Sequence, residues 1–251
     1  MKTSMHGRLA IGTWILLAAA TAATLVACGD DATGPVEVGM SGNAFSFAPP
    51  GFPGWGRIEG ASVWVLEAPE YRTTTVDDGY FRIDGLPAGM EATLVLEAEG
   101  YPRTHTKTFA LPETDVDLVT FQVPNDGLYD GLAALAETEL DPTKCSMATT
   151  VTVLGKSLYD PGAHGEAGAI VTIDPPVPAA NGPIYFNEDV LPDRSYTESS
   201  ADGGVAFVNL DPGDYTLTAT KPGVKIRSVK MRCRAGVLVN ASPPYGLQVY
   251  E

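Results

Sequence analysis

The 251-residue chain has little basic charge and few of the residues that usually build catalytic sites. It holds 16 lysines and arginines against 31 aspartates and glutamates, a net charge of −15 at pH 7. Because nucleic-acid affinity depends on basic contacts to phosphate, this balance excludes a nucleic-acid partner and favours solubility. The chain has no zinc-peptidase motif, G-x-S-x-G elbow or phosphate-binding loop. We therefore predict no enzyme activity, no catalytic residues, no metal and no cofactor.

Histidine is equally scarce. Beyond the first residues of the chain only His105 and His164 occur, and we expect both to be solvated residues of strands or loops. Two groups of aspartates offer a calcium site as an alternative, since calcium prefers carboxylate and carbonyl oxygens. Aspartate is also a usual residue of tight turns, and no EF-hand spacing is present, so we favour the turn interpretation. The groups are Asp77, Asp78 and Asp84, and Asp202, Asp211 and Asp214.

The N-terminus contains an uncharged apolar run, residues 9–27, after the basic residues Lys2 and Arg8. This pattern is typical of a secretory signal peptide, although the run approaches the length of a membrane-spanning helix. The stretch "LVAC" at 25–28 resembles the bacterial lipoprotein box. The resemblance implies that residues 1–27 are removed and that Cys28 carries acyl chains such as palmitate. It also implies attachment to a membrane of the bacterial cell envelope, at the outer membrane or the periplasmic face.

The chain has three cysteines, so a pair remains after Cys28. Cys145 and Cys233 are an even pair in an exported protein, and we predict a disulfide between them. Two isolated cysteines lack the paired spacing of a metal site.

A segment with the pattern of a turn, a strand and a second turn occurs twice, as "DDGYFRIDGLPAG" at 77–89 and "DGGVAFVNLDPG" at 202–213. Each copy follows a strand pattern of period two, "GASVWVLE" at 60–67 and "GAIVTID" at 168–174. Asp-Gly pairs favour hairpin turns. The alternation predicts that four side chains point inward: Phe81 and Ile83 in the first copy, Val205 and Phe207 in the second.

These repeats resemble the carboxypeptidase regulatory-like domain, a small Ig-like or prealbumin-like β-sandwich also similar to the B-type repeats of bacterial surface stalks. The resemblance implies accessory, stalk or adhesive modules without a shared active site. We therefore expect an all-β protein with two β-sandwich domains joined by a short helix. The predicted parts are a signal peptide (1–27), a tether (28–42), a first sandwich (43–124), a helical connector (125–142) and a second sandwich (143–251).

The connector contains leucines at helical spacing, and its pattern predicts a helix over 127–139 that packs between the sandwiches. A lid or a partner-binding helix is the alternative. Phe45 and Phe47 indicate an early edge strand before the first repeat.

Two features are candidates for binding. The second copy carries an insertion, residues 175–200, and long loops on a rigid sandwich often carry recognition. Its aromatic residues Tyr185, Phe186 and Tyr196 are candidates for contact with a ligand. The alternative is that Ile184 and Phe186 pack back onto the core. A basic ladder would meet an anionic envelope glycan or the acidic first domain, or it would be a solvated edge strand. It consists of Lys230, Arg232 and Arg234.

We therefore expect a lipid-anchored envelope protein with a structural or binding role, either as a glycan- or protein-recognition module or as a spacer or adhesion module. The alternative is a non-catalytic accessory subunit of an envelope enzyme or transport system. An enzyme of unrecognised type is the least favoured class.

Overall fold

The computed structural model describes residues 36–156, 160 and 164–251. The described residues belong to one compact unit. The predicted signal peptide, Cys28 and most of the tether lie outside the described residues. Within the described ranges, no helix is both long enough and apolar enough to cross a membrane. The fold is all-β, as predicted, with a single α-helix among the described elements.

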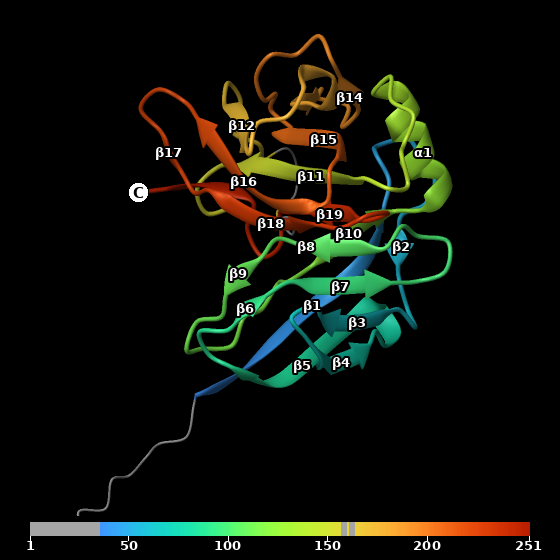
Figure 1. Ribbon diagram of the computed structural model, residues 1–251, viewed down its shortest axis with the longest axis vertical. Helices are drawn as coiled ribbons and strands as arrows, with labels where there is room; N and C mark the ends of the chain where they lie inside the picture. Colours follow the sequence, from blue (N-terminus) through green and yellow to red (C-terminus); the bar gives the residue numbers. More distant parts are fainter. Residues whose placement is uncertain (1–35, 157–159, 161–163) are drawn as a thin grey trace, which may run out of the picture. The chain divides into compact units, whose positions relative to one another are not determined.

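The first half of the structure is a β-sandwich (Figure 1). Strand β1 pairs parallel with β10 and antiparallel with β5, and the facing sheet has the order β8-β7-β3-β4. The elements of this half are β1 (Glu37–Phe47), β2 (Gly56–Arg57), β3 (Ser62–Val65), β4 (Ala68–Thr74), the 3-10 turn η1 (Asp77–Gly79), β5 (Tyr80–Pro87), β6 (Glu91–Ala92), β7 (Leu94–Glu97), β8 (Thr104–Thr106), β9 (Phe109–Ala110) and β10 (Phe121–Pro124).

The second half repeats this arrangement. Strand β11 pairs parallel with β19 and antiparallel with β15, and the facing sheet has the order β12-β16-β18. The elements of this half are β11 (Cys145–Thr152), β12 (Ile170–Asp174), the 3-10 turn η2 (Ala179–Asn181), β13 (Ile184–Phe186), β14 (Pro192–Asp193), β15 (Gly204–Leu210), β16 (Gly213–Thr220), β17 (Lys225–Ile226), β18 (Val229–Cys233), β19 (Leu238–Asn240) and β20 (Leu247–Tyr250).

Each half has its own hydrophobic core between its two sheets. The four side chains predicted to point inward are all buried: Phe81, Ile83, Val205 and Phe207. Burying a side chain of this size contributes about 2 kcal/mol relative to leaving it in water. The period-two pattern therefore identified the core-facing side of both repeats correctly.

The glycine in each of the two repeated turns is required for a steric reason. Gly79 and Gly203 both have a left-handed backbone, with φ of 67° and 79°. A Cβ atom at Gly79 would lie 2.4 Å from the carbonyl oxygen of Ala44 in β1. A Cβ atom at Gly203 would lie 2.3 Å from the carbonyl oxygen of Val151 in β11. Glycine is thus required twice, because the turn passes against the neighbouring strand in both copies.

The two sandwiches share a sheet, which the sequence did not predict. Strand β19 of the second half pairs parallel with β8 of the first, and Figure 1 shows the two strands side by side. Val239 is opposite His105, and the Leu238 N–H donates to the Arg103 carbonyl at 3.0 Å. This pairing makes one 11-stranded sheet that runs through both halves.

Helix α1 (Asp126–Leu135) lies between the halves and contacts β10 of the first and β14 of the second. Asn125 begins the helix by accepting a hydrogen bond from the Leu128 N–H at 2.9 Å. The helix ends earlier than the predicted residue 139. Glu137 has a φ of 52°, which a continuing helix does not allow.

The start of the first sandwich also differs from the prediction. Strand β1 begins at Glu37, earlier than the predicted start at residue 43. It is not an edge strand, because Phe45 pairs with Gln122 of β10 and also with Arg57 of β2. The alternation of Phe45 and Phe47 indicates only the end of β1, because the residues before them in the strand are mostly small or polar.

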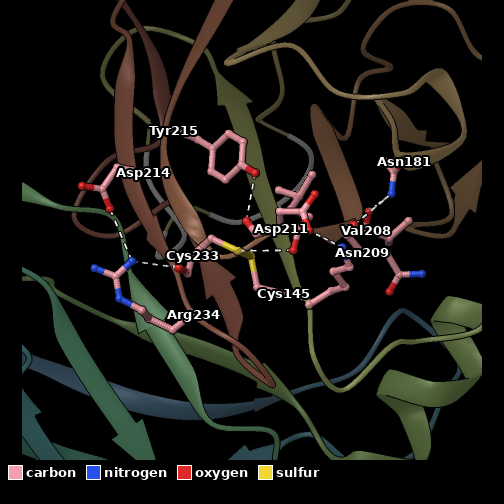
Figure 2. The surroundings of a disulfide bond; sticks show 11 residues. Cys145, Asn181, Val208, Asn209, Asp211, Asp214, Tyr215, Cys233 and Arg234 are labelled. Atoms are coloured by element: carbon pink, nitrogen blue, oxygen red, sulfur yellow. Dashed lines mark hydrogen bonds and ion pairs between the residues drawn. A yellow bond between two sulfur atoms is a disulfide. The ribbon is translucent and has the colours of Figure 1, made fainter.

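Cys145 and Cys233 form a disulfide, as the cysteine count predicts (Figure 2). It connects β11 of one sheet to the end of β18 in the facing sheet. Tyr215 lies nearby and donates its hydroxyl hydrogen bond to the Asp211 carbonyl at 2.9 Å.

Candidate functional site

A cavity of about 550 Å³ lies between the second sandwich, helix α1 and the loop of residues 48–55. Its size is within the range of small-molecule sites, about 300–1,000 Å³. Its walls are mostly apolar. Representative lining residues are Phe47, Trp55, Leu132, Ala148, Ala206 and Leu238.

The floor of the cavity is the outer face of the sheet that contains β11, β15 and β19. Ala148 of β11 is opposite Ala206 of β15 on one side and Asn240 of β19 on the other. Ala206 is in turn opposite Ile184 of β13. Two adjacent alanines in the middle of this row leave room above the sheet, so the cavity is a consequence of residue size. From Ser146 to Thr150, the floor extends about 13 Å along β11.

The same face of the first sandwich is filled with polar side chains. Aligning the two repeated turns relates Tyr80, Arg82 and Asp84 of β5 to Gly204, Ala206 and Val208 of β15. Arg82 forms ion pairs with Asp84 at 2.7 Å and with Asp115 at 2.6 Å. These contacts raise the pKa of the guanidinium and hold the pKa of Asp115 below its ordinary value. The hollow apolar face therefore belongs to the second copy and is not a general property of the repeat.

Helix α1 and the loop of residues 48–55 form the roof. The helix contributes Tyr129, Leu132 and Ala133. Burial raises the pKa of the Tyr129 hydroxyl, which hydrogen-bonds Ser146 of the floor. The loop contributes Trp55, whose side chain packs edge-on against Phe47 with ring centroids 6.1 Å apart.

One end of the cavity is polar. Asp202, Glu188 and His164 all line it, next to the turn where β15 begins. The Gly204 N–H donates to Asp202 Oδ2 at 3.0 Å. Burial raises the pKa of Asp202, Glu188 raises it further, and the Gly204 hydrogen bond and His164 lower it. The cavity thus combines a long apolar body with carboxylates at one end.

The predicted recognition residues of the insertion have separate roles. Tyr185 is buried in the second core, where its hydroxyl accepts a hydrogen bond from the Val171 N–H at 2.9 Å, and burial raises its pKa. It is therefore a core residue and not a surface contact. Phe186 lines the cavity. Tyr196 packs partly against the core and donates to Glu188 at 2.8 Å.

The basic ladder is neutralised by acidic neighbours. Arg232 of β18 lies 2.6 Å from Glu67 and 2.7 Å from Glu91, both in the first sandwich. Lys230 also approaches Glu91, at 3.7 Å, and Arg234 approaches Asp214 at 3.4 Å. Arg232 therefore contacts the acidic first domain, whereas the Lys230 and Arg234 side chains are 71% and 45% exposed and remain largely solvated.

The histidine prediction fails for His105, which is 2% exposed within β8. Burial lowers its pKa to about 4, and the positive charges of Arg234 and Arg103 lower it as well, against a hydrogen bond to the Arg232 backbone. His105 lies where the two sandwiches share their sheet, so the pairing of β8 with β19 accounts for its burial.

Several of the aspartates have turn or ion-pair partners. Asp202 accepts the Gly204 N–H within its turn, Asp84 pairs with Arg82, and Lys144 pairs with Asp211. In the part of the chain that the structure describes, no group of three or more aspartate, glutamate, histidine or cysteine residues has an arrangement that could hold a metal ion.

Period-two alternation predicts the inward residues of the repeated strand but does not say what its outward residues meet. The signal for the cavity was nonetheless present. The outward residues of the repeated strand change from Tyr80, Arg82 and Asp84 to Gly204, Ala206 and Val208. Three small or apolar outward residues in a row indicate a face that something else must cover.

Comparisons with known proteins give only distant structural similarity. No protein-family model matches the chain, and no curated protein matches it. The Bacillus anthracis TIE protein aligns with 14% identity and a TM-score of 0.28, over 86% of this chain and 35% of that one. The minor pilin GBS52 of Streptococcus agalactiae aligns with 11% identity and a TM-score of 0.27, over 84% and 95%. A streptococcal ancillary pilin aligns with 16% identity and a TM-score of 0.23, over 83% and 63%.

The chain thus covers about a third of the length of the Bacillus anthracis protein. Similarity at this level carries no inference about activity or partners. The resemblance to carboxypeptidase regulatory-like domains stays a prediction from the repeated motif.

Proposed function

We propose that this chain is a lipid-anchored binding protein of the bacterial cell envelope, and that it holds a small apolar molecule in the cavity between the second sandwich and helix α1. The role is binding without catalysis. The lipoprotein box at Cys28 supports the anchor, and the cavity supports the binding role. A ligand held there would contact both sandwiches and the helix that joins them.

The observation that carries the proposal is the replacement of a charged face by an apolar one at equivalent positions. Arg82 and Ala206 occupy the same place in the two repeats, yet only Ala206 lies under a roof. An apolar face of this kind loses its favourable burial if it is left open to water. Helix α1 covers it only partly, because a cavity of about 550 Å³ remains.

The test is the binding of N-phenylnaphthylamine, a neutral apolar dye whose fluorescence rises when it leaves water. The chain would start at Gly29, since the described residues beyond the tether form one compact unit. We expect saturable binding by this chain. Ala206→Leu should abolish it, because the added side chain fills the middle of the floor.

The matched control is Arg82→Leu, which places the same side chain at the equivalent position of the first sandwich. It should leave dye binding unchanged. Saturable binding that survives Ala206→Leu with unchanged affinity would contradict the cavity as the site. Absence of dye binding by the folded chain would instead favour a spacer role, which the shared sheet and the disulfide would also suit.

Membrane attachment is tested separately with Cys28→Ala in the exporting cell. We expect this variant to leave the membrane fraction, because the thiol that carries the acyl chains is lost. A Cys28→Ala protein that stays with the membrane would overturn lipid anchoring without affecting the cavity.

A further inference from the structure

The polar end of the cavity indicates the chemical class of the ligand. Asp202 and Glu188 come from different elements, one from the turn before β15 and the other from the segment after β13. Both line the same cavity, and Glu188 acts electrostatically on Asp202. Asp202 is half-buried, whereas Glu188 is exposed and accepts a hydrogen bond from the Tyr196 hydroxyl at 2.8 Å. Two carboxylates at one end of a cavity repel each other unless a positive charge stands between them.

Among the described residues that line the cavity, His164 is the one basic side chain, and it lowers the pKa of Asp202. The groups that act electrostatically on Asp202 are His164 and Glu188. No lysine or arginine is among the described residues that line the cavity, and two cations of the second sandwich pair with other carboxylates, Arg232 with Glu67 and Lys221 with Glu166. The cavity end therefore presents a negative potential next to an apolar wall.

An aromatic ring completes this end. A Cβ atom at Gly204 would lie 2.9 Å from Phe186 Cβ and the same distance from its Cγ, so Phe186 packs directly over the start of β15. Carboxylates beside an aromatic side chain are a suitable environment for an ammonium group, which both types of side chain attract.

We infer that the cavity binds an amphiphile with a cationic amine head, placed between Asp202, Glu188 and Phe186, and with an apolar body that lies along the floor toward Ser146. This inference rests on the proposed binding function. It assigns the polar end to the head and the alanine floor to the body.

The experiment compares decylamine, decanol and decanoate as competitors of N-phenylnaphthylamine at pH 7 and constant ionic strength, below the concentrations at which they aggregate. The three share one apolar body and differ in head charge. We expect decylamine to bind about tenfold more tightly than decanol, the order of one charge-assisted hydrogen bond. Decanoate should bind most weakly, because its carboxylate would face Asp202 and Glu188.

The variant is Glu188→Gln with Asp202→Asn, which keeps side-chain shape and an oxygen acceptor for the Gly204 N–H. It should reduce decylamine affinity to that of decanol and leave decanol unchanged. The control is Glu59→Gln with Glu113→Gln, two exposed carboxylates that do not line the cavity. It removes the same charge and should retain the preference for the amine. Glu188→Gln alone changes an exposed side chain and should reduce the preference partly, which covers the case of a misfolded double variant.

Two results would overturn the inference and leave the proposed function in place: equal binding of decylamine and decanol by the unaltered chain, or an equal loss of preference in the variant and the control. If no competitor displaces the dye and the dye itself does not bind, the proposed function falls together with the inference.

Discussion

The two sandwiches have similarly built cores but chemically different outer faces. In both, the strand after the repeated turn buries its inward residues against a facing sheet. On the outward side, the first sandwich has Arg82 in a network of exposed ion pairs, whereas the second has Ala206 on the floor of a cavity. Core positions thus preserve the fold, while outward positions decide whether a face is open to water or lines a cavity.

The halves also differ in their cross-linking and in their net charge. The second has a disulfide between its sheets, and among the described residues the first has none. The net charge differs too: residues 29–141 hold 20 acidic and 5 basic residues, and residues 142–251 hold 11 and 9. The junction uses this difference, because Arg232 of the second half lies between Glu67 and Glu91 of the first.

The largest expected effect concerns the disulfide. Cys145→Ala with Cys233→Ala removes a cross-link between residues 88 positions apart. We expect a loss of about 4 kcal/mol in the free energy of unfolding, because the unfolded chain gains conformational freedom. Urea unfolding of the chain from Gly29 measures this. An unchanged midpoint would mean that the second sandwich depends on the cross-link no more than the first.

The next effect is the pH dependence of stability that His105 causes from β8, at the point where the two halves share a sheet. Its pKa is about 4 in the fold, below the value of 6.5 for a solvated histidine. The unfolded chain therefore binds a proton between pH 6.5 and 4 that the folded chain does not. Stability should fall over this interval as pH decreases, by up to about 3 kcal/mol at pH 4.

The control for this titration is His105→Gln, which keeps a polar side chain but does not titrate. Unfolding followed at several pH values should show a flatter profile for the variant between pH 6.5 and 4. Identical pH profiles for the two proteins would show that His105 is not buried neutral between the sandwiches.

A smaller effect on stability distinguishes Arg232, at the junction of the two halves, from Arg82, on the outer face of the first sandwich. Arg232→Ala should cost about 2 kcal/mol, because it removes charge-assisted hydrogen bonds and leaves the largely buried Glu67 without its cation. Glu67 and Arg232 side chains are 15% and 23% exposed, whereas Arg82 is 37% exposed. Arg82→Ala should therefore cost much less, since exposed ion pairs contribute little. Equal melting temperatures for the two variants would contradict the junction role of Arg232.

Local pattern was sufficient to predict much of the fold. The alternation of Phe81 and Ile83, the Asp-Gly turns and the cysteine pair depend on neighbouring residues or on a simple count. Leucine spacing predicts the helix, which ends at Leu135 and not at residue 139. These features are determined within a few residues, so a single sequence contains them.

The features that were not predicted depend on contacts between distant segments. The pairing of β19 with β8 buries His105, which looks like a solvated strand residue in isolation. The sequence offers Tyr185 as a recognition residue, whereas the folded chain buries it in the second core. The small and apolar outward residues of β15 indicate a face that must be covered. The cavity itself also requires Ala148 and Ala206 to become neighbours across strands and α1 to pass over them, and no local pattern contains that arrangement.

The most direct measurement is a crystal structure of the chain from Gly29 grown with a bromine-labelled decylamine. We expect an anomalous bromine peak over the alanine floor between β11, β15 and helix α1, with the amine near Asp202 and Glu188. Well-ordered ligand bound elsewhere, or helix α1 packed tightly on the sheet with no space over Ala148 and Ala206, would contradict this expectation.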